Sequence, residues 1–206
     1  MTDRFADQLI VGHAAHVMAD FPDNSVDLVI TSPPYWTAVE YEGGCPWASY
    51  AEYLADLQMV WRQCTRVLGP NGKLCINAPI MPIPQAVIRQ DTRHLKDIAG
   101  DIKRLILAEA GLHLFSVFVW QKQTSKLMLG SYPHPGNILE CNTTEFIHVY
   151  VKPGKPPKFD DQVKVANTLS RAEWLGLTQQ VWFMYPADVK RGGDHPAPFP
   201  ISCRLA

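Results

Sequence analysis

The sequence has no CxxC pair, no apolar run long enough to span a membrane and no excess of either charge. Its five cysteines show no zinc-ligand spacing with histidine, so we interpret them as isolated buried thiols and expect no metal site. The N-terminus carries acidic residues where a signal peptide has a basic start, and a cytoplasmic location is the expectation. A net charge of −1 gives no global basic field, so nucleic acid would have to be held by local basic patches.

The chain has 206 residues, of which 47% are apolar and 19% are charged. This length and apolar content are enough for one sizeable core. We expect strands at residues 8–11, 26–31, 73–77, 112–120 and 145–151, and helices at residues 49–68 and 97–111. Apolar residues recur every three or four positions in the first helix, Ser49 is expected to cap it with Glu52 completing a capping box, and Trp61 and Trp120 are expected in the core. This alternation predicts an α/β fold with a mainly parallel sheet. The strand at residues 26–31 is almost continuously apolar, which indicates a strand covered on both faces.

The segment TSPPYW, residues 31–36, ends that apolar strand, because proline cannot donate to a strand ladder. Ligand sites of α/β proteins lie at the carboxyl ends of parallel strands. Pro33 and Pro34 fix the backbone, so the Ser32 hydroxyl and the Pro33 carbonyl would be held rigidly as two acceptors. A tight turn without a chemical role is the alternative for this segment alone.

Two acceptors aimed at one point suit a group with two donor hydrogens, such as the exocyclic amino group of a nucleobase. Such hydrogen bonds would localise the nitrogen lone pair toward an electrophilic methyl group. Tyr35 offers a flat face on which a base could stack, and Trp36 offers a second wall. A base inside a duplex cannot present this group, so we expect the target base to be flipped out.

Residues 27–36, DLVITSPPYW, resemble the catalytic motif of DNA amino-methyltransferases, in the form usual for cytosine-N4 enzymes. Adenine-N6 enzymes more often have Asp where Ser32 stands. Further similar blocks follow in the order of the circularly permuted β group: RVLGPNGKLCIN at residues 66–77, VWQK at 119–122, TEFIHVYVKPG at 144–154 and HPAPFP at 195–200.

This resemblance implies a Rossmann-like, S-adenosylmethionine-dependent methyltransferase fold with an antiparallel final strand. It implies a single catalytic domain over residues 1–206, in which residues 152–194 form a connector or a target-recognition insertion. The implied catalytic residues are those of the Ser-Pro-Pro-Tyr motif, and the cofactor would be S-adenosylmethionine. By resemblance, its contacts would come from Thr31, Ser32, His13, His195 and Phe199.

The sequence departs from the family pattern at two places. Gly12-His13 stands where members commonly have Gly-Asp, so an acidic contact near the cofactor is absent or replaced. The glycine-rich Phe-x-Gly-x-Gly turn, which follows the HPxxFP block in the permuted order, is not found before Ala206. We therefore expect the fold to be incomplete at the C-terminus, without the main part of the cofactor pocket.

The expected function is site-specific methylation of cytosine N4 in double-stranded DNA, as in restriction-modification systems. Adenine-N6 methylation is one alternative. A catalytically incomplete or split fragment that binds DNA, a complementing chain or a second copy is another. Basic residues that could contact DNA phosphates, each with surface solvation as its alternative, are Lys122, Lys126, Lys152, Lys155, Lys158, Lys190 and Arg191. His134 could contact DNA or the flipped base, with loop solvation as its alternative.

Overall fold

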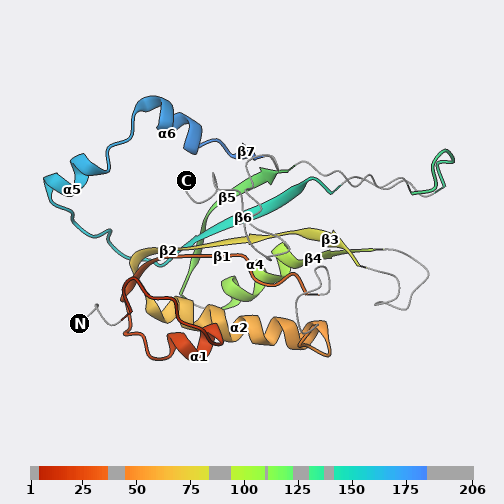
Figure 1. Cartoon of the computed structure of the whole chain (residues 1–206), viewed down its shortest axis with the longest axis horizontal. Helices are drawn as coiled ribbons and strands as arrows, with labels where there is room; N and C mark the ends of the chain where they lie inside the picture. Colours follow the sequence, from red (N-terminus) through yellow and green to blue (C-terminus); the bar gives the residue numbers. More distant parts are fainter. Residues whose placement is uncertain are drawn as a thin grey trace.

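The computed structural model describes residues 5–36, 45–83, 94–109, 111–122, 130–136 and 142–184. Its elements, labelled as in Figure 1, are α1 (Ala14–Met18), β1 (Val26–Thr31), α2 (Tyr50–Val67), β2 (Leu68–Ala78), β3 (Ile80–Pro82), β4 (Leu95–Asp97), α4 (Ile98–Ala108), β5 (His113–Gln121), β6 (Thr144–Val151), α5 (Asp161–Ala166), α6 (Arg171–Leu177) and β7 (Val181–Phe183). The predicted helices and all but the first of the predicted strands are therefore confirmed, with small shifts of their ends.

Five of the described strands form one sheet in the order β1-β2-β6-β5-β7. β1 pairs parallel with β2, and β5 pairs parallel with β7, whereas β6 is antiparallel to both of its neighbours. Four strands thus run in one direction and β6 runs against them, which confirms the predicted mainly parallel sheet. The antiparallel strand is not the final one as predicted, because β7 follows β6 in the chain and pairs parallel with β5. β3 and β4 form a separate two-stranded sheet.

Helices α1, α2 and α4 lie on the same side of the sheet, below it in Figure 1. α2 begins as predicted: the Ser49 hydroxyl accepts a hydrogen bond from the Glu52 amide (3.1 Å), and the Glu52 carboxylate reaches back to the Ala48 amide (2.9 Å). Its apolar stripe, with Leu57 and Trp61, is buried against the helix-covered face of the sheet. The predicted burial of Trp61 and Trp120 is confirmed, since they are 3% and 9% exposed.

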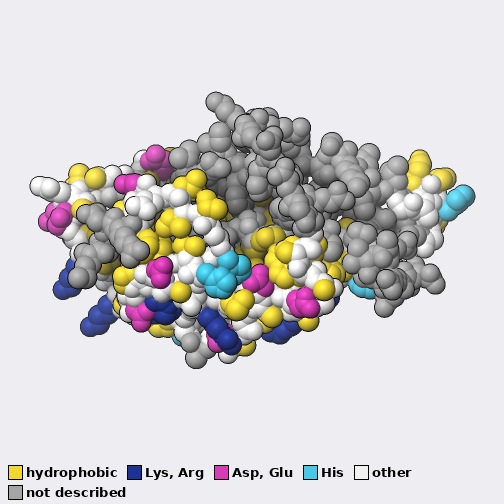
Figure 2. Space-filling model, turned by 60° about the horizontal axis from the view of Figure 1, so that its bottom comes forward, with side chains coloured by type: hydrophobic (Ala, Val, Ile, Leu, Met, Phe, Trp, Pro, Cys, Tyr) yellow, Lys and Arg dark blue, Asp and Glu magenta, His cyan; other side chains and the backbone are white. Residues whose placement is uncertain are grey.

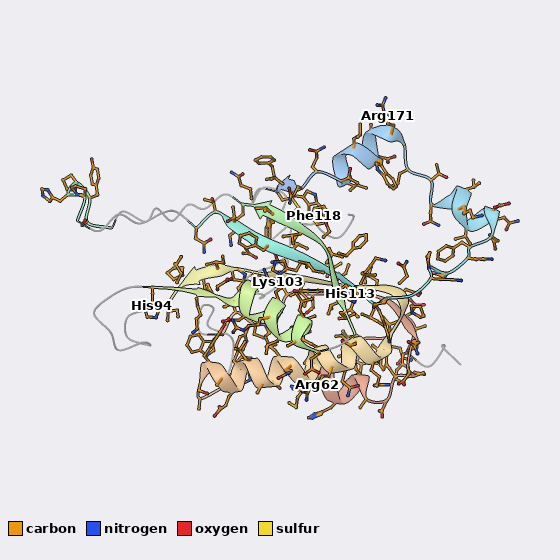
Figure 3. The ribbon with its side chains drawn as sticks, turned by 180° about the vertical axis from the view of Figure 1, so that it is seen from behind. Arg62, His94, Lys103, His113, Phe118 and Arg171 are labelled. Atoms are coloured by element: carbon orange, nitrogen blue, oxygen red, sulfur yellow. The ribbon has the colours of Figure 1, made fainter. Side chains whose placement is uncertain are left out.

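The opposite face of the sheet is open at β1. Leu28 and Ile30 are 52% and 65% exposed, whereas Val29 between them packs against the core. The prediction that this strand is covered on both faces is therefore wrong. The physical reason is that β1 is an edge strand of the described sheet and the described helices near it lie on one side only. Figure 3 shows Phe118 of β5 on this same open face, while Arg62 of α2 points away from the sheet on the helix side.

Residues 8–11 are not a strand, although the sequence predicted one. Leu9 and Val11 are 95% and 92% exposed, and no described strand pairs with this segment. An apolar, β-prone run becomes a strand only when a neighbouring strand accepts its backbone hydrogen bonds. Local sequence could not supply that partner.

After β6 the chain leaves the sheet and returns to it at β7. The excursion contains α5, which lies beyond the ends of the strands in Figure 1, and α6, which lies above the sheet in the same view; Arg171, labelled in Figure 3, begins α6. Ser170 forms a capping box at the N-terminus of α6, and Asp160 caps the N-terminus of α5. Neither helix has a buried residue. The excursion covers most of residues 152–194, which the sequence predicted to be a connector or a target-recognition insertion.

Figure 2 shows that acidic, basic and hydrophobic side chains are intermixed on the helix side of the molecule. No helix in the described part of the chain is both long and apolar enough to cross a membrane. Within the same residues, no group of histidine, cysteine and carboxylate side chains is arranged to hold a metal ion. Cys45, Cys64 and Cys75 are free thiols; Cys64 is buried as predicted and Cys75 is half-buried. The prediction of burial is wrong for Cys45, which is exposed because it lies in the segment before α2 and not in the core.

Candidate functional site

The Ser-Pro-Pro-Tyr segment leaves the carboxyl end of β1 and is fixed against α2. Ser32 is half-buried, Pro33 is buried and Pro34 is exposed. The Tyr53 hydroxyl, from α2, donates to the Pro34 carbonyl at 2.8 Å. Tyr35 is 9% exposed, so most of its ring lies inside the protein. The motif is thus held as a rigid corner between the sheet and a helix.

Trp36 follows this corner with a positive φ of 52°, and its ring packs edge-on against Tyr50 with 4.9 Å between centroids. The Tyr50 hydroxyl donates to Asp101 Oδ2 of α4 at 2.6 Å. Burial, followed by the hydrogen bond to Asp101, raises the pKa of Tyr50 far above its usual value. The Lys96 ammonium lies 4.1 Å from the Tyr50 ring centroid. The second aromatic wall is therefore immobilised by α2, α4 and β4.

A buried polar network joins Ser32 to three other strands of the sheet. The Ser32 hydroxyl donates to the Tyr35 hydroxyl oxygen (2.8 Å), and the Tyr35 hydroxyl donates to Glu145 Oε2 (2.8 Å). Asn77 Nδ2 donates both to the Tyr35 oxygen (2.9 Å) and to Glu145 Oε2 (2.5 Å). The Lys122 ammonium binds the other oxygen, Glu145 Oε1. Four hydrogen-bonding residues thus converge around Tyr35.

Sheet topology explains this convergence. Ser32, Asn77 and Lys122 lie at or just after the carboxyl ends of the parallel strands β1, β2 and β5. Glu145 lies at the amino end of β6, opposite Trp120, and because β6 runs antiparallel its start meets those carboxyl ends at the same edge. The edge predicted to hold a ligand site therefore carries this network.

Burial makes a charge in this network energetically costly unless it is paired. Glu145 and Asn77 are each 4% exposed, and an ionised carboxylate at that depth requires both a cation and hydrogen-bond donors. Lys122 supplies the cation and Asn77 and Tyr35 supply donors. Asn77 Oδ1 is buried and has no partner among the described residues, which leaves one acceptor of this site unused.

Sequence reasoning missed Glu145 and Asn77. Glu145 lies 110 residues from Tyr35 and Asn77 lies 42 residues from it, so neither is near the motif in the chain. One signal was available: both are polar residues at the ends of otherwise apolar strands predicted to meet at one edge.

His13, predicted to contact the cofactor, is linked to the motif through α2. Its Nε2 lies 2.8 Å from Asp56 Oδ1, and the Trp47 indole donates to Asp56 Oδ2 at 3.0 Å. Trp47 in turn packs edge-on against Tyr53, whose hydroxyl binds the Pro34 carbonyl. The sequence lacks the family's aspartate at position 13, but the fold brings the carboxylate of Asp56 beside it.

Two of the lysines predicted to contact DNA have internal partners. Lys122 binds Glu145. The Lys152 ammonium donates to the carbonyls of Leu68 (2.7 Å) and Thr65 (2.8 Å) at the end of α2, and to Asn24 Oδ1 (2.9 Å). Lys155 and Lys158 are exposed.

His134 is exposed in the turn at residues 130–136, where the Ser131 hydroxyl donates to its carbonyl at 2.5 Å. Five predicted contact residues lie outside the described residues: Lys126, Lys190, Arg191, His195 and Phe199.

Comparison with known proteins identifies the family to which this chain is similar. The sequence model of a family described as DNA methylase, of the N6 and N4 type, matches residues 26–203. The type II methyltransferase M.MjaVI of Methanocaldococcus jannaschii is 27% identical over 177 residues, which covers 85% of this chain and 84% of that protein. The type II beta methyltransferase M.BslI of a Bacillus species is 24% identical over 201 residues, 94% of this chain but only 21% of M.BslI.

Solved structures give the same picture. TTHA0409 of Thermus thermophilus, determined with S-adenosyl-L-methionine, matches 95% of this chain and 71% of its own length, with a TM-score of 0.71 and 28% identity. The cytosine-N4-specific PvuII DNA methyltransferase matches 94% of this chain and 66% of its own, with a TM-score of 0.62 and 18% identity. At that identity the PvuII comparison shows the fold alone, and the fold is that of S-adenosylmethionine-dependent methyltransferases.

Proposed function

The chain belongs to the DNA methylase family of N6 and N4 amino-methyltransferases, and from this premise we propose that it methylates cytosine N4 in double-stranded DNA. The observation that carries the proposal is the Ser32 hydroxyl at the carboxyl end of β1, whose hydrogen is donated inward to Tyr35. Its oxygen therefore presents lone pairs, which suit the two hydrogens of an exocyclic amino group. A serine at this position is the form usual for cytosine enzymes.

In the proposed reaction, Ser32 and the Pro33 carbonyl orient the flipped amino group and draw its hydrogens away from the ring plane. This localises the nitrogen lone pair, so that the nitrogen can attack a methyl carbon. The immobilised Trp36, which is half-buried, would bound the base, together with the small part of Tyr35 that is exposed. Rigidity matters because small displacements of orienting groups cost large factors in rate.

The family's methyl donor is S-adenosylmethionine, which supplies an electrophilic methyl group when bound. The described residues fit one wall of its site: Thr31 and Ser32 are half-buried, and the neighbouring Ile30 is 65% exposed. A surface of mixed polarity suits a ligand with an apolar thioether and charged amino-acid groups. We propose Thr31, Ser32 and His13 as contacts to the donor.

The test is product analysis. Duplex DNA would be incubated with the chain and S-adenosylmethionine carrying a labelled methyl group, digested to nucleosides and examined by mass spectrometry. We expect N4-methylcytosine, and we expect S32A to lower the rate by about a hundredfold, as for loss of one oriented polar group in other enzymes. The same change at Ser25, in the turn before β1, is the matched control and should leave the rate unchanged.

The alternative base is adenine, because the family includes N6 enzymes and the residues around Ser32 offer acceptors that would serve either amino group. N6-methyladenine without N4-methylcytosine in the same digest would replace the cytosine proposal with this one.

A second candidate function is a fragment that binds DNA and receives the donor together with a complementing chain or a second copy. The exposed apolar side chains Leu28 and Ile30 on the open edge strand favour it. Calorimetric titration of S-adenosylmethionine into this chain alone separates the two candidates, since binding would refute the fragment. We propose that the chain acts in the cytoplasm, as the sequence predicted.

A further inference from the structure

The direction of the hydrogen bonds around Tyr35 is determined by chemistry. An ionised carboxylate only accepts hydrogen bonds, so the single hydrogen of the Tyr35 hydroxyl is the one that joins it to Glu145 Oε2 at 2.8 Å. The Tyr35 oxygen is then an acceptor toward Asn77 Nδ2 (2.9 Å) and toward Ser32. The hydroxyl hydrogen of Ser32 must therefore point inward.

The consequence appears at the surface of the site. With its hydrogen donated to Tyr35, the Ser32 oxygen has only acceptor capacity left for a ligand, and no described residue donates to it. Asn77 Oδ1, buried and unpartnered among the described residues, is a further acceptor in the same network. The site is thus polarised toward acceptors by a negative charge that lies two hydrogen bonds behind Ser32.

Lys122 and Asn77 stabilise the buried negative charge of Glu145. Glu145 is 4% exposed, and a carboxylate at such depth needs a cation and hydrogen-bond donors beside it. The Lys122 ammonium at Oε1 supplies the cation, and the Asn77 amide at Oε2 supplies a donor.

We propose that Glu145, held by Lys122 and Asn77, is a positioning residue that fixes Ser32 as a hydrogen-bond acceptor and so makes the site select an amino group over a carbonyl oxygen. The inference rests on the proposed function in taking a nucleobase as the ligand. The inference goes beyond the proposed function by assigning the selectivity between amino and keto bases to residues outside the Ser-Pro-Pro-Tyr motif.

Glu145→Gln is the informative variant because it reverses the chain of hydrogen bonds. Lys122 holds the amide oxygen of the new side chain, so its NH2 group faces Tyr35 and donates to the Tyr35 oxygen. The Tyr35 hydrogen then turns to Ser32, and the Ser32 hydrogen turns outward into the site. Asn77 can rotate its amide so that Oδ1 accepts from the new NH2 group. A site that accepted from an amine becomes one that donates to a carbonyl.

The experiment measures nucleoside binding to the full chain by NMR titration. Cytidine and uridine form one pair, and adenosine and inosine form a second; each pair differs by an amino group in place of a carbonyl oxygen. We expect the wild-type chain to prefer the amino member of at least one pair by about tenfold or more. E145Q should abolish or invert that preference, E145D should retain it, and D20N, the same carboxylate-to-amide change at an exposed site, should leave it unchanged.

Y35F provides a second test if E145Q does not fold, since it also frees the Ser32 hydrogen and should also abolish the preference. Where methyl transfer is measurable, E145Q should lower kcat by about tenfold or more with little change in KM for DNA. Equal binding of both members of each pair by the wild-type chain, binding of neither, or a preference that survives both variants would overturn the inference.

Failure here is distinguishable from failure of the proposed function. Nucleoside binding needs no methyl donor, so a chain without transfer activity still gives a result. A product of N6-methyladenine would refute the cytosine proposal while the adenosine and inosine pair continued to test Glu145.

Discussion

Replacement of Lys152 by methionine tests whether this lysine holds the fold together or contacts DNA. Its ammonium donates to the carbonyls of Leu68 (2.7 Å) and Thr65 (2.8 Å) and to Asn24 Oδ1 (2.9 Å). These bonds join the C-terminus of α2, the start of β2 and the turn before β1. Methionine keeps the apolar stem and removes only the charge and its hydrogens, so the variant isolates the ammonium.

The magnitude follows from the number and kind of bonds lost. A hydrogen bond from a charged donor contributes about 1.5 to 3 kcal/mol, and a cation at a helix C-terminus adds up to about 2 kcal/mol when partly buried. Lys152 is only half-buried, so water replaces part of the loss at the exposed carbonyls. We expect K152M to lower the free energy of unfolding by about 2 to 3 kcal/mol, which corresponds to a fall in Tm of about 4 to 12 °C.

Urea unfolding followed by tryptophan fluorescence measures the stability, and DNA affinity as a function of salt measures phosphate contacts. The exposed lysines provide matched controls: K155M and K158M should change stability by less than about 0.5 kcal/mol. If they contact phosphates, each should reduce the salt slope of DNA binding by about one, whereas K152M should not. Unchanged stability of K152M together with a reduced salt slope would refute the reasoning.

Three further predictions follow from the described contacts. Y53F removes the 2.8 Å hydrogen bond to the Pro34 carbonyl, and the loss of about 1 kcal/mol of positioning should slow methyl transfer by up to about tenfold; an unchanged rate would mean that Tyr53 does not position the motif. Burial lowers the pKa of His148, so the folded state binds its proton more weakly than the unfolded chain. Stability from this group is fully present above the unfolded pKa of about 6.5 and is lost as pH falls through the folded value; H148Q should flatten the decline in urea midpoint below about pH 7. Burial raises the pKa of Cys64 to about 12, so under native conditions iodoacetamide should modify exposed Cys45 and spare Cys64 in peptide mass spectra; comparable labelling of both would contradict its burial.

Local patterns in the sequence were sufficient for most of the elements. The three- and four-residue spacing of apolar residues and the Ser49 cap predicted α2, and the structure places it at Tyr50–Val67. The β-branched run correctly predicted the bounds of β1, Val26–Thr31. These features depend on neighbours within a few residues, which a sequence displays directly.

The errors concern partners that lie elsewhere in the chain. Residues 8–11 have the composition of a strand but no described strand beside them, and Leu28 and Ile30 have the composition of a buried face but are exposed. Burial and strand pairing depend on which element arrives at a surface. An apolar pattern shows only that a surface is available for covering.

The candidate site divides in the same way. The sequence by itself determined the Ser-Pro-Pro-Tyr corner, because diproline stiffness and its place after a strand are local properties. Only the tertiary structure decided what stands behind Ser32: an antiparallel β6 brings Glu145 to the carboxyl ends of the parallel strands, 110 residues from Tyr35. Hydrogen-bond direction depends on the charge at the end of the chain of donors and acceptors, and that charge is placed by folding.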